Sequence, residues 1–450
     1  MPRNPAERLS ALVQIPTVSA RIESTGIGPF ERFIETLRLL YPQLHSTLEC
    51  ERTSNLGLLY RWKGTDPALA QHPIVLMAHF DVTPVDFPDQ WTHPPFSGSI
   101  ADGRVWGRGA FDNKGALVAM CEAIESLLSR GFTPRRDVYL SFSGNGKTFG
   151  NAAADNAEAL LDRGVRPYMV LDEGGAVVEA PLPKVNALAA MVGVGAKGVM
   201  TIRLTCEGTP GQISAPSRRS PIARIGRAVA RVSSGNFPAR LPMAVPAMVA
   251  ALAPQATGLW RVLYETLLRT PVTTAQVFSA LGGQAAALAQ TTVAPTIIEG
   301  GSDPASVPRS AGATLVVRIH VGGTIESTLR LIKRRIDDPK IVVTMVEGSN
   351  PCQESPIDNA QFSAIREAVD ASYPAVVTAP YVMMAATDSR HFASFSDSIY
   401  RFSPLTLSSE QRPTAHNVDE WVEIDSLHRG QIFYEHLIRT TTGVGLTGSQ

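Results

Sequence analysis

Three near-continuous apolar runs in the first half of the chain, each followed by polar residues, constrain the fold most. The runs and the polar residues behind them are 74–78 before His79 and Asp81, 137–142 before Asn145 and Lys147, and 168–171 before Asp172. Runs of this length are typical of strands buried on both faces of a parallel or mixed sheet. Polar residues just past the carboxyl ends of such strands indicate a ligand site at that edge.

Composition narrows the class of protein. The chain has 450 residues, a formal net charge of zero and 44% hydrophobic residues, which predicts a soluble globular protein of at least two domains. A balanced charge gives no electrostatic reason to expect nucleic acid or a membrane surface as partner. The N-terminus has no long apolar leader, and the four cysteines form no CxxC pair. We therefore expect a cytoplasmic protein with reduced cysteines.

The order of predicted elements indicates two domains. An apolar stripe from Leu117 to Leu128 predicts a helix between the first two strands, giving the alternation typical of α/β folds. A ferredoxin-like β-α-β-β-α-β order is predicted from strand 199–205, helix 219–233, strands 292–299 and 313–320, helix 324–336 and strand 341–347. Residues 234–290 are Ala- and Leu-rich and are predicted to be helical. We expect a mixed, mostly parallel sheet flanked by helices over 1–195 and 350–450, interrupted by a ferredoxin-like α+β domain over 196–349.

Four residues at predicted strand ends and loops could bind a metal ion: His79, Asp112, Asp172 and His416. Imidazole and carboxylate groups together suit zinc or a related divalent ion. Asp81, two residues after His79, could orient that imidazole from behind. The alternative for each residue alone is an ordinary one, because Asp112 could be a helix cap and His416 a solvated loop histidine.

Five segments together resemble one known family: LMAHFDVTPV, DGRVWGRGAFDNKGALVAM, YMVLDEGG, ATDSRHF and AHNVDE. Their order and spacing are similar to those of the M20 metallopeptidases, which include carboxypeptidase S-type, dipeptidase-type and aminoacylase-like enzymes. The resemblance extends over nearly the whole chain. It implies a zinc scaffold in which His79, Asp112, Asp172 and His416 are ligands, with Asp112 bridging two ions. It also implies that the inserted domain is a lid through which two chains form a homodimer.

The departures from this family fall on the groups that serve hydrolysis. Where the family has two adjacent glutamates, a general base and a metal ligand, this chain has Gly146 and Lys147, and no Glu or Asp occurs from 139 to 154. Gln212 replaces the lid histidine that stabilises the oxyanion in the family. Losing a general base costs roughly 100- to 10,000-fold in rate, and losing an oxyanion donor roughly 100- to 1,000-fold. We therefore expect very weak peptidase activity.

Other family positions are changed or kept. The asparagine of an NVxP-like segment corresponds to Ala305 or Ser306, and a Gly-Gly pair corresponds to Ala385 and Ala386. The substrate-binding candidates are Arg318 and Arg390, which match arginines that the family keeps, and Asn145.

Lys147 is one of only seven lysines in the chain and has two interpretations. Its ammonium could replace the second metal ion, pair with Asp112 and lie near His416. Beside a zinc ion its pKa should fall, so that it could also act as acid, base or nucleophile. In the other interpretation Lys147 points to solvent. With either one, we expect one zinc ion rather than two, or none.

Three functions remain open on sequence alone. The first is an M20-like enzyme whose step is not hydrolysis but amide formation, cyclisation or elimination on a small amino-acid- or peptide-like carboxylate, with Lys147, Asp81 and Gln212 as catalytic candidates. The excess of arginine over lysine suggests a GC-rich bacterial gene, and a step of this kind would suit bacterial biosynthesis. The second is a mono-zinc peptidase or N-acyl-amino-acid hydrolase with a re-tuned site. The third is a non-catalytic homologue that binds an amino-acid-like ligand or a partner chain.

Overall fold

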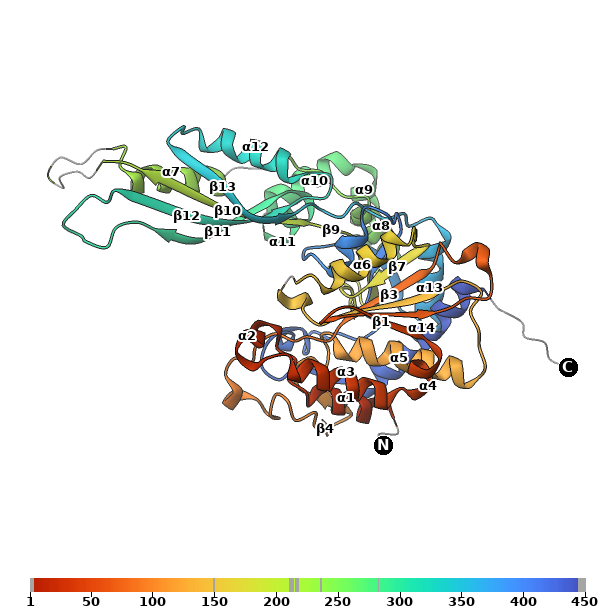
Figure 1. The fold of residues 1–450 in the computed structure, drawn as a ribbon. Coiled ribbons are helices and arrows are strands. Elements are labelled where there is room, and N and C mark those ends of the chain that lie inside the picture. Colours follow the sequence, from red (N-terminus) through yellow and green to blue (C-terminus); the bar gives the residue numbers. More distant parts are fainter. Residues whose placement is uncertain are drawn as a thin grey trace.

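The computed structural model describes residues 4–148, 150–209, 214, 218–234, 237–281 and 283–443. It contains a helix-flanked sheet and a smaller, elongated domain that projects from one side of it (Figure 1). Within the described residues, no helix is both long and apolar enough to cross a membrane.

The central sheet is mixed and mostly parallel in its interior. Its strand order is β1-β2-β6-β3-β7-β15-β9-β14, with β8 paired to β9. The pairs β3–β6, β3–β7, β7–β15 and β9–β14 are parallel. The strands are β1 Glu49–Ser54, β2 Gly57–Trp62, β3 Ile74–His79, β6 Val138–Ser143, β7 Met169–Asp172, β8 Val177–Glu179, β9 Leu188–Ala196, β14 Val377–Met383 and β15 Ile399–Arg401. All residues of β3, β6 and β7 are buried, as the apolar runs predict.

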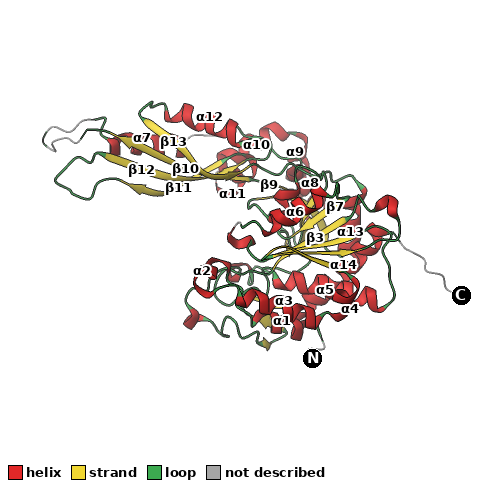
Figure 2. Ribbon diagram, viewed as in Figure 1, coloured by secondary structure: helices red, strands yellow, loops and turns green. Residues whose placement is uncertain are grey.

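Helices cover both faces of this sheet (Figure 2). One face packs against α1 Pro5–Val13, α3 Gly28–Leu40, α4 Pro42–Thr47, α5 Lys114–Ser129, α13 Ala360–Ser372 and α14 Ile424–Thr442. The other face packs against α6 Ala152–Asp162 and the short helix η6 Asp388–Phe392. A short helix, α2 Ile22–Thr25, lies in the N-terminal segment. The predicted α/β architecture is confirmed.

The projecting domain is a four-stranded antiparallel sheet with the order β11-β12-β10-β13. Its strands are β10 Gly198–Glu207, β11 Thr292–Glu299, β12 Ser310–Ile319 and β13 Ile341–Ser349, and its helices are α7 Pro221–Ser233 and α12 Ile325–Ile336. This order and connectivity is the ferredoxin-like pattern. Both helices pack on one face, around Ile202, Leu204 and Leu315.

The segment between α7 and β11 belongs only partly to that domain. It forms α8 Ala244–Leu252, α9 Leu259–Arg269, α10 Pro271–Leu281 and α11 Gly283–Ala289. Met248, Val249 and Leu252 pack against Ala189 and Met191 of β9 in the central sheet. Part of the range 196–349 therefore packs on the larger domain, through the apolar side of α8.

A third, small sheet lies next to the carboxyl edge of the central sheet. It has the order β16-β5-β4, from β16 Trp421–Glu423, β5 Arg104–Trp106 and β4 Ile100–Ala101. This sheet joins the loop before α5 to the segment before α14. Two loops that are far apart in sequence are thereby brought to the edge where β3, β6 and β7 end.

Candidate active site

A cavity of about 390 Å³ opens at the carboxyl ends of the central strands. Its lining includes His79, Thr83, Asp112, Gly146, Lys147, Glu173, Thr387, Asp388, Arg390 and His416. His79 is the last residue of β3, and Glu173 follows directly after β7. The site therefore lies where the sequence predicts it, at the carboxyl edge of buried parallel strands.

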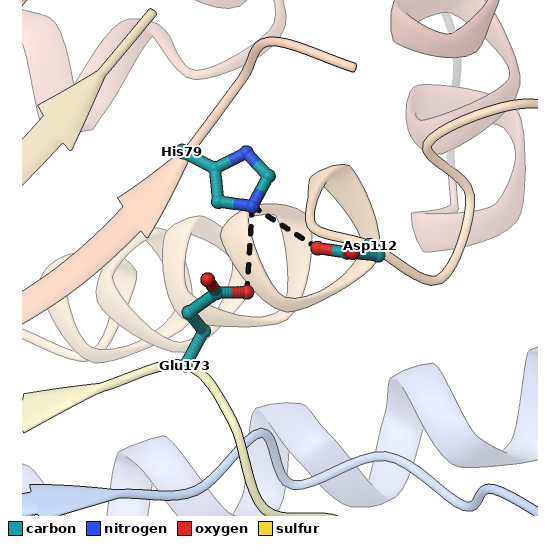
Figure 3. A group of neighbouring side chains, drawn as sticks. All are labelled: His79, Asp112 and Glu173. Carbon is teal, nitrogen blue, oxygen red and sulfur yellow. Dashed lines mark hydrogen bonds and ion pairs between the residues drawn. The ribbon is translucent and has the colours of Figure 1, made fainter. Parts of the chain in front are cut away.

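Three candidate metal ligands, His79, Asp112 and Glu173, face one another in this cavity (Figure 3). His79 Nε2 lies 3.0 Å from Asp112 Oδ1 and 3.3 Å from Glu173 Oε2. One ligand atom from each residue lies within 4.8 Å of the others. An imidazole and two carboxylates at this spacing suit a single divalent cation with an open position.

Lys147 occupies the other side of Asp112. Its Nζ donates to Asp112 Oδ2 at 2.6 Å and lies 3.4 Å from His416 Nε2. His416 Nε2 also contacts Asp112 Oδ2. Because an ammonium has no lone pair and repels cations, Lys147 is not itself a metal ligand.

The charge of Lys147 is fixed by its surroundings. Burial alone would lower its pKa, but the carboxylates of Asp112, Glu173 and Asp81 outweigh burial and raise the pKa above the ordinary lysine value. Three carboxylates therefore favour the protonated form of Lys147. The lowered pKa expected from the sequence applies to Lys147 beside a zinc ion and stays a prediction.

The same charges act on the metal-binding candidates. Burial opposes ionisation of Asp112, but Lys147, His416 and His79 outweigh it and hold its pKa well below the usual range. Burial and Lys147 oppose protonation of His79, yet Glu173 and Asp112 raise its pKa well above the ordinary value. A metal ion must therefore displace a proton from His79, so its affinity should rise with pH.

Asp81 supports the site from behind. The Nδ1 atom of His79 lies 2.9 Å from the Asp81 carbonyl oxygen and 3.3 Å from its Oδ1. The Asp81 carboxylate accepts hydrogen bonds from Ser19 Oγ and from the backbone N–H groups of Gly146 and Lys147, at 2.6, 3.1 and 2.9 Å. One carboxylate thus orients the imidazole and also holds the loop that carries Lys147.

The third ligand candidate of the cluster is Glu173, whereas the sequence assigned that role to Asp172. Asp172 Oδ1 accepts from Glu173 N at 2.8 Å and its Oδ2 from Ser389 N at 2.7 Å. Both oxygens are thereby directed to backbone groups. The two carboxylates are adjacent in sequence, and only the turn of the chain after β7 decides which one reaches His79.

The other predicted site residues are not all brought together. Arg390 lines the cavity, and its Nη1 lies 3.9 Å from Asp388 Oδ1. Asn145 instead stabilises its own loop, where its Oδ1 accepts from Ala152 N at 3.2 Å. Arg318 lies on β12, paired with Val199 in the four-stranded sheet. Gln212 lies outside the described residues.

Glu420 is a positioning residue that the sequence did not single out. It is buried, and its Oε1 accepts from the backbone N–H groups of Gly109, Phe111 and Asp112 at 3.0, 3.1 and 3.1 Å. Its Oε2 accepts from Arg108 Nη1 at 2.9 Å. The sequence signal that could have identified Glu420 is its position four residues after His416. Glu420 ties the two loops that carry Asp112 and His416 to each other.

Replacing Glu420 by alanine should therefore destabilise the protein strongly. The substitution leaves the Arg108 guanidinium buried without its carboxylate and removes the acceptor of three N–H groups. We expect the free energy of unfolding to fall by about 3–5 kcal/mol, measured by urea denaturation. Glu410→Ala, at an exposed and weakly paired glutamate, should change it by less than about 0.5 kcal/mol. A loss below about 1 kcal/mol in Glu420→Ala would contradict the role of Glu420.

Comparison with solved structures supports the fold. An M20 family metallo-carboxypeptidase from Sulfolobus solfataricus superimposes with a TM-score of 0.66 and 19% identity, covering 97% of this chain and 98% of the other. Human carnosine dipeptidase 1 gives a TM-score of 0.61 at 14% identity, covering 97% and 96%.

Sequence comparison identifies the family. A probable carboxypeptidase S-like protein of Dictyostelium discoideum is 32% identical over 446 residues, covering 97% of this chain and 85% of the relative. An N-fatty-acyl-amino acid synthase/hydrolase of Mus musculus is 30% identical over 439 residues, covering 93% and 84%. The family model for peptidase family M20/M25/M40 matches residues 75–440. Together with the geometry of the site, this shows that the chain belongs to peptidase family M20/M25/M40.

Proposed function

We propose that this protein forms amide bonds between an acyl group and an amino-acid- or peptide-like carboxylate substrate. The observation that carries the proposal is the ion pair between Lys147 Nζ and Asp112 Oδ2 at 2.6 Å. A cation there takes the place of one metal ion while His79, Asp112 and Glu173 remain clustered. The site keeps electrostatic stabilisation and loses the groups that activate water.

The loss of these groups affects water and amines differently. Water is a weak nucleophile and depends on a base or a metal ion for activation. A neutral amine already carries a reactive lone pair, so it attacks a polarised carbonyl with less help. A site with Gly146 in place of a glutamate is therefore better suited to passing an acyl group from an ester to an amine than to passing it to water.

Two further observations favour an amino-acid-like substrate. Arg390 lines the cavity, and a guanidinium binds carboxylates well. One relative is named an N-fatty-acyl-amino acid synthase/hydrolase, and amide synthesis on such a substrate would be the same class of step. The hydrolase part of that name keeps a mono-zinc hydrolase as the second candidate.

His79, Asp112 and Glu173 would hold one zinc ion. When bound, zinc would polarise the acyl carbonyl as a Lewis acid. Asp81 would orient His79, and Lys147 would keep Asp112 ionised. We propose a single ion because the ammonium group excludes a second one.

Zinc stoichiometry tests this arrangement. The wild-type protein should bind no more than one zinc ion per chain, and Lys147→Glu should bind two, because a carboxylate replaces the repelling ammonium. Metal analysis after dialysis against zinc would measure both. Lys184→Glu, at an exposed lysine, should match the wild type. Two tightly bound ions in the wild type would contradict the role given to Lys147.

The reaction is tested by supplying acyl esters and amino acids and following N-acyl-amino acid formation by mass spectrometry. The wild type should form the amide, and Lys147→Ala should be slower by roughly 100-fold or more, because the positive charge beside Asp112 is lost from the site. Slow hydrolysis alone, unaffected by changing Lys147 or His79, would refute the proposal. Absence of turnover with every pair would favour a binding protein.

We also propose a homodimer formed through the four-stranded sheet. Its outer strands β11 and β13 expose apolar side chains, among them Ile298 and Val346, and edge strands with such side chains are prone to pairing. Analytical ultracentrifugation should give about twice the chain mass. A mass of 48.3 kDa, that of one chain, would contradict the dimer.

A further inference from the structure

The carboxylate of Asp388 lies in the active-site cavity but comes from a part of the chain remote from Gly146 and Lys147. Asp388 is the first residue of η6 and is buried. Its Oδ2 accepts a hydrogen bond from Ser143 Oγ, at the end of β6, at 2.7 Å. Asp388 and Gly146 both line the cavity.

Asp388 occupies the space that a side chain at position 146 would need. A Cβ atom built on Gly146 would lie only 2.9 Å from Asp388 Oδ2, closer than real Cβ atoms approach an oxygen, and 3.5 Å from Ser143 Oγ. The same Cβ would lie 3.5 Å from the Cβ of His79. The carboxylate of Asp388 therefore lies directly beside position 146, where a side chain would begin.

The surroundings of Asp388 raise the pKa of its carboxyl group. Burial and the nearby charge of Asp172 raise the pKa of Asp388 to about 6, although Ser143, Arg390 and His79 act in the opposite direction. A carboxyl group with a pKa near the working pH exchanges protons efficiently in both directions.

We propose that Asp388 is the catalytic carboxylate of this site, in the place of the glutamate that the sequence lacks at position 146. The proposal rests on the proposed amide-forming function. The neutral amine attacks the carbonyl carbon of an acyl ester, so that a C–N bond forms. Asp388 takes a proton from the attacking nitrogen and gives it to the departing alkoxide oxygen, which leaves as an alcohol when the C–O bond breaks. Nothing is oxidised or reduced.

The first experiment removes the charge of Asp388 with little change of shape. In the amide-forming assay with the full-length protein, Asp388→Asn should lower kcat by roughly 100-fold or more and leave KM nearly unchanged, because the substrate still binds. Asp397→Asn, at an exposed aspartate, is the matched control and should retain full activity. A melting temperature close to that of the wild type shows that the variant is folded.

The second experiment displaces the carboxylate without changing its chemistry. Gly146→Ala forces Asp388 Oδ2 to move, and kcat should fall roughly 10- to 100-fold, since small misplacements of a reacting group are costly. Gly28→Ala, where nothing lies within 4 Å of the new methyl group, is its control. If both substitutions act through one carboxylate, the double variant should be no slower than Asp388→Asn alone.

The outcomes separate the two proposals. An active wild type with an equally active Asp388→Asn variant would overturn the role of Asp388 and leave the proposed function standing. Losses that multiply in the double variant would overturn it too, because the two sites would then act independently. A wild type that forms no amide would overturn the proposed function, and the role of Asp388 with it.

Discussion

The burial of β3, β6 and β7 on both faces is the constraint on which the site depends. Parallel strands that are covered on both sides expose polar groups only at their ends, so His79, Ser143 and Asp172 meet at one edge. What differs from a dinuclear hydrolase is the charge distribution at this edge. One ammonium and two imidazoles face a group of carboxylates, and this arrangement favours the protonated form of Lys147 and the ionised form of Asp112.

Much of the fold could be predicted from periodicity alone. The strand predicted over 292–299 and the helix over 324–336 match β11 and α12 within one residue, because their apolar spacing is unambiguous. Strands β9 and β14 were missed. β9 is rich in Ala and Gly, and β14 contains Pro380, so neither has the β-branched run that marks a strand. The packing of α8 on the central sheet depends on tertiary contacts, which no local pattern encodes.

The residues of the site also divide into those that the sequence could predict and those that it could not. His79, Asp112 and Lys147 could be located because each follows or precedes an element with a clear pattern. The choice between Asp172 and Glu173 could not be made, since it depends on which carboxylate the backbone N–H groups of Glu173 and Ser389 engage. Asp388 lies 245 residues from Ser143, to which it is hydrogen-bonded, and sequence spacing carries no information about such a contact.

Glu420 has a consequence for how the molecule is made. It accepts a hydrogen bond from the backbone of Asp112, 308 residues earlier in the chain, and closing so long a loop is costly until the domain around it has formed. During synthesis, β3, β6 and β7 leave the ribosome long before Glu420 does. The strands of the site are therefore synthesised well before the residue that fixes the Asp112 loop.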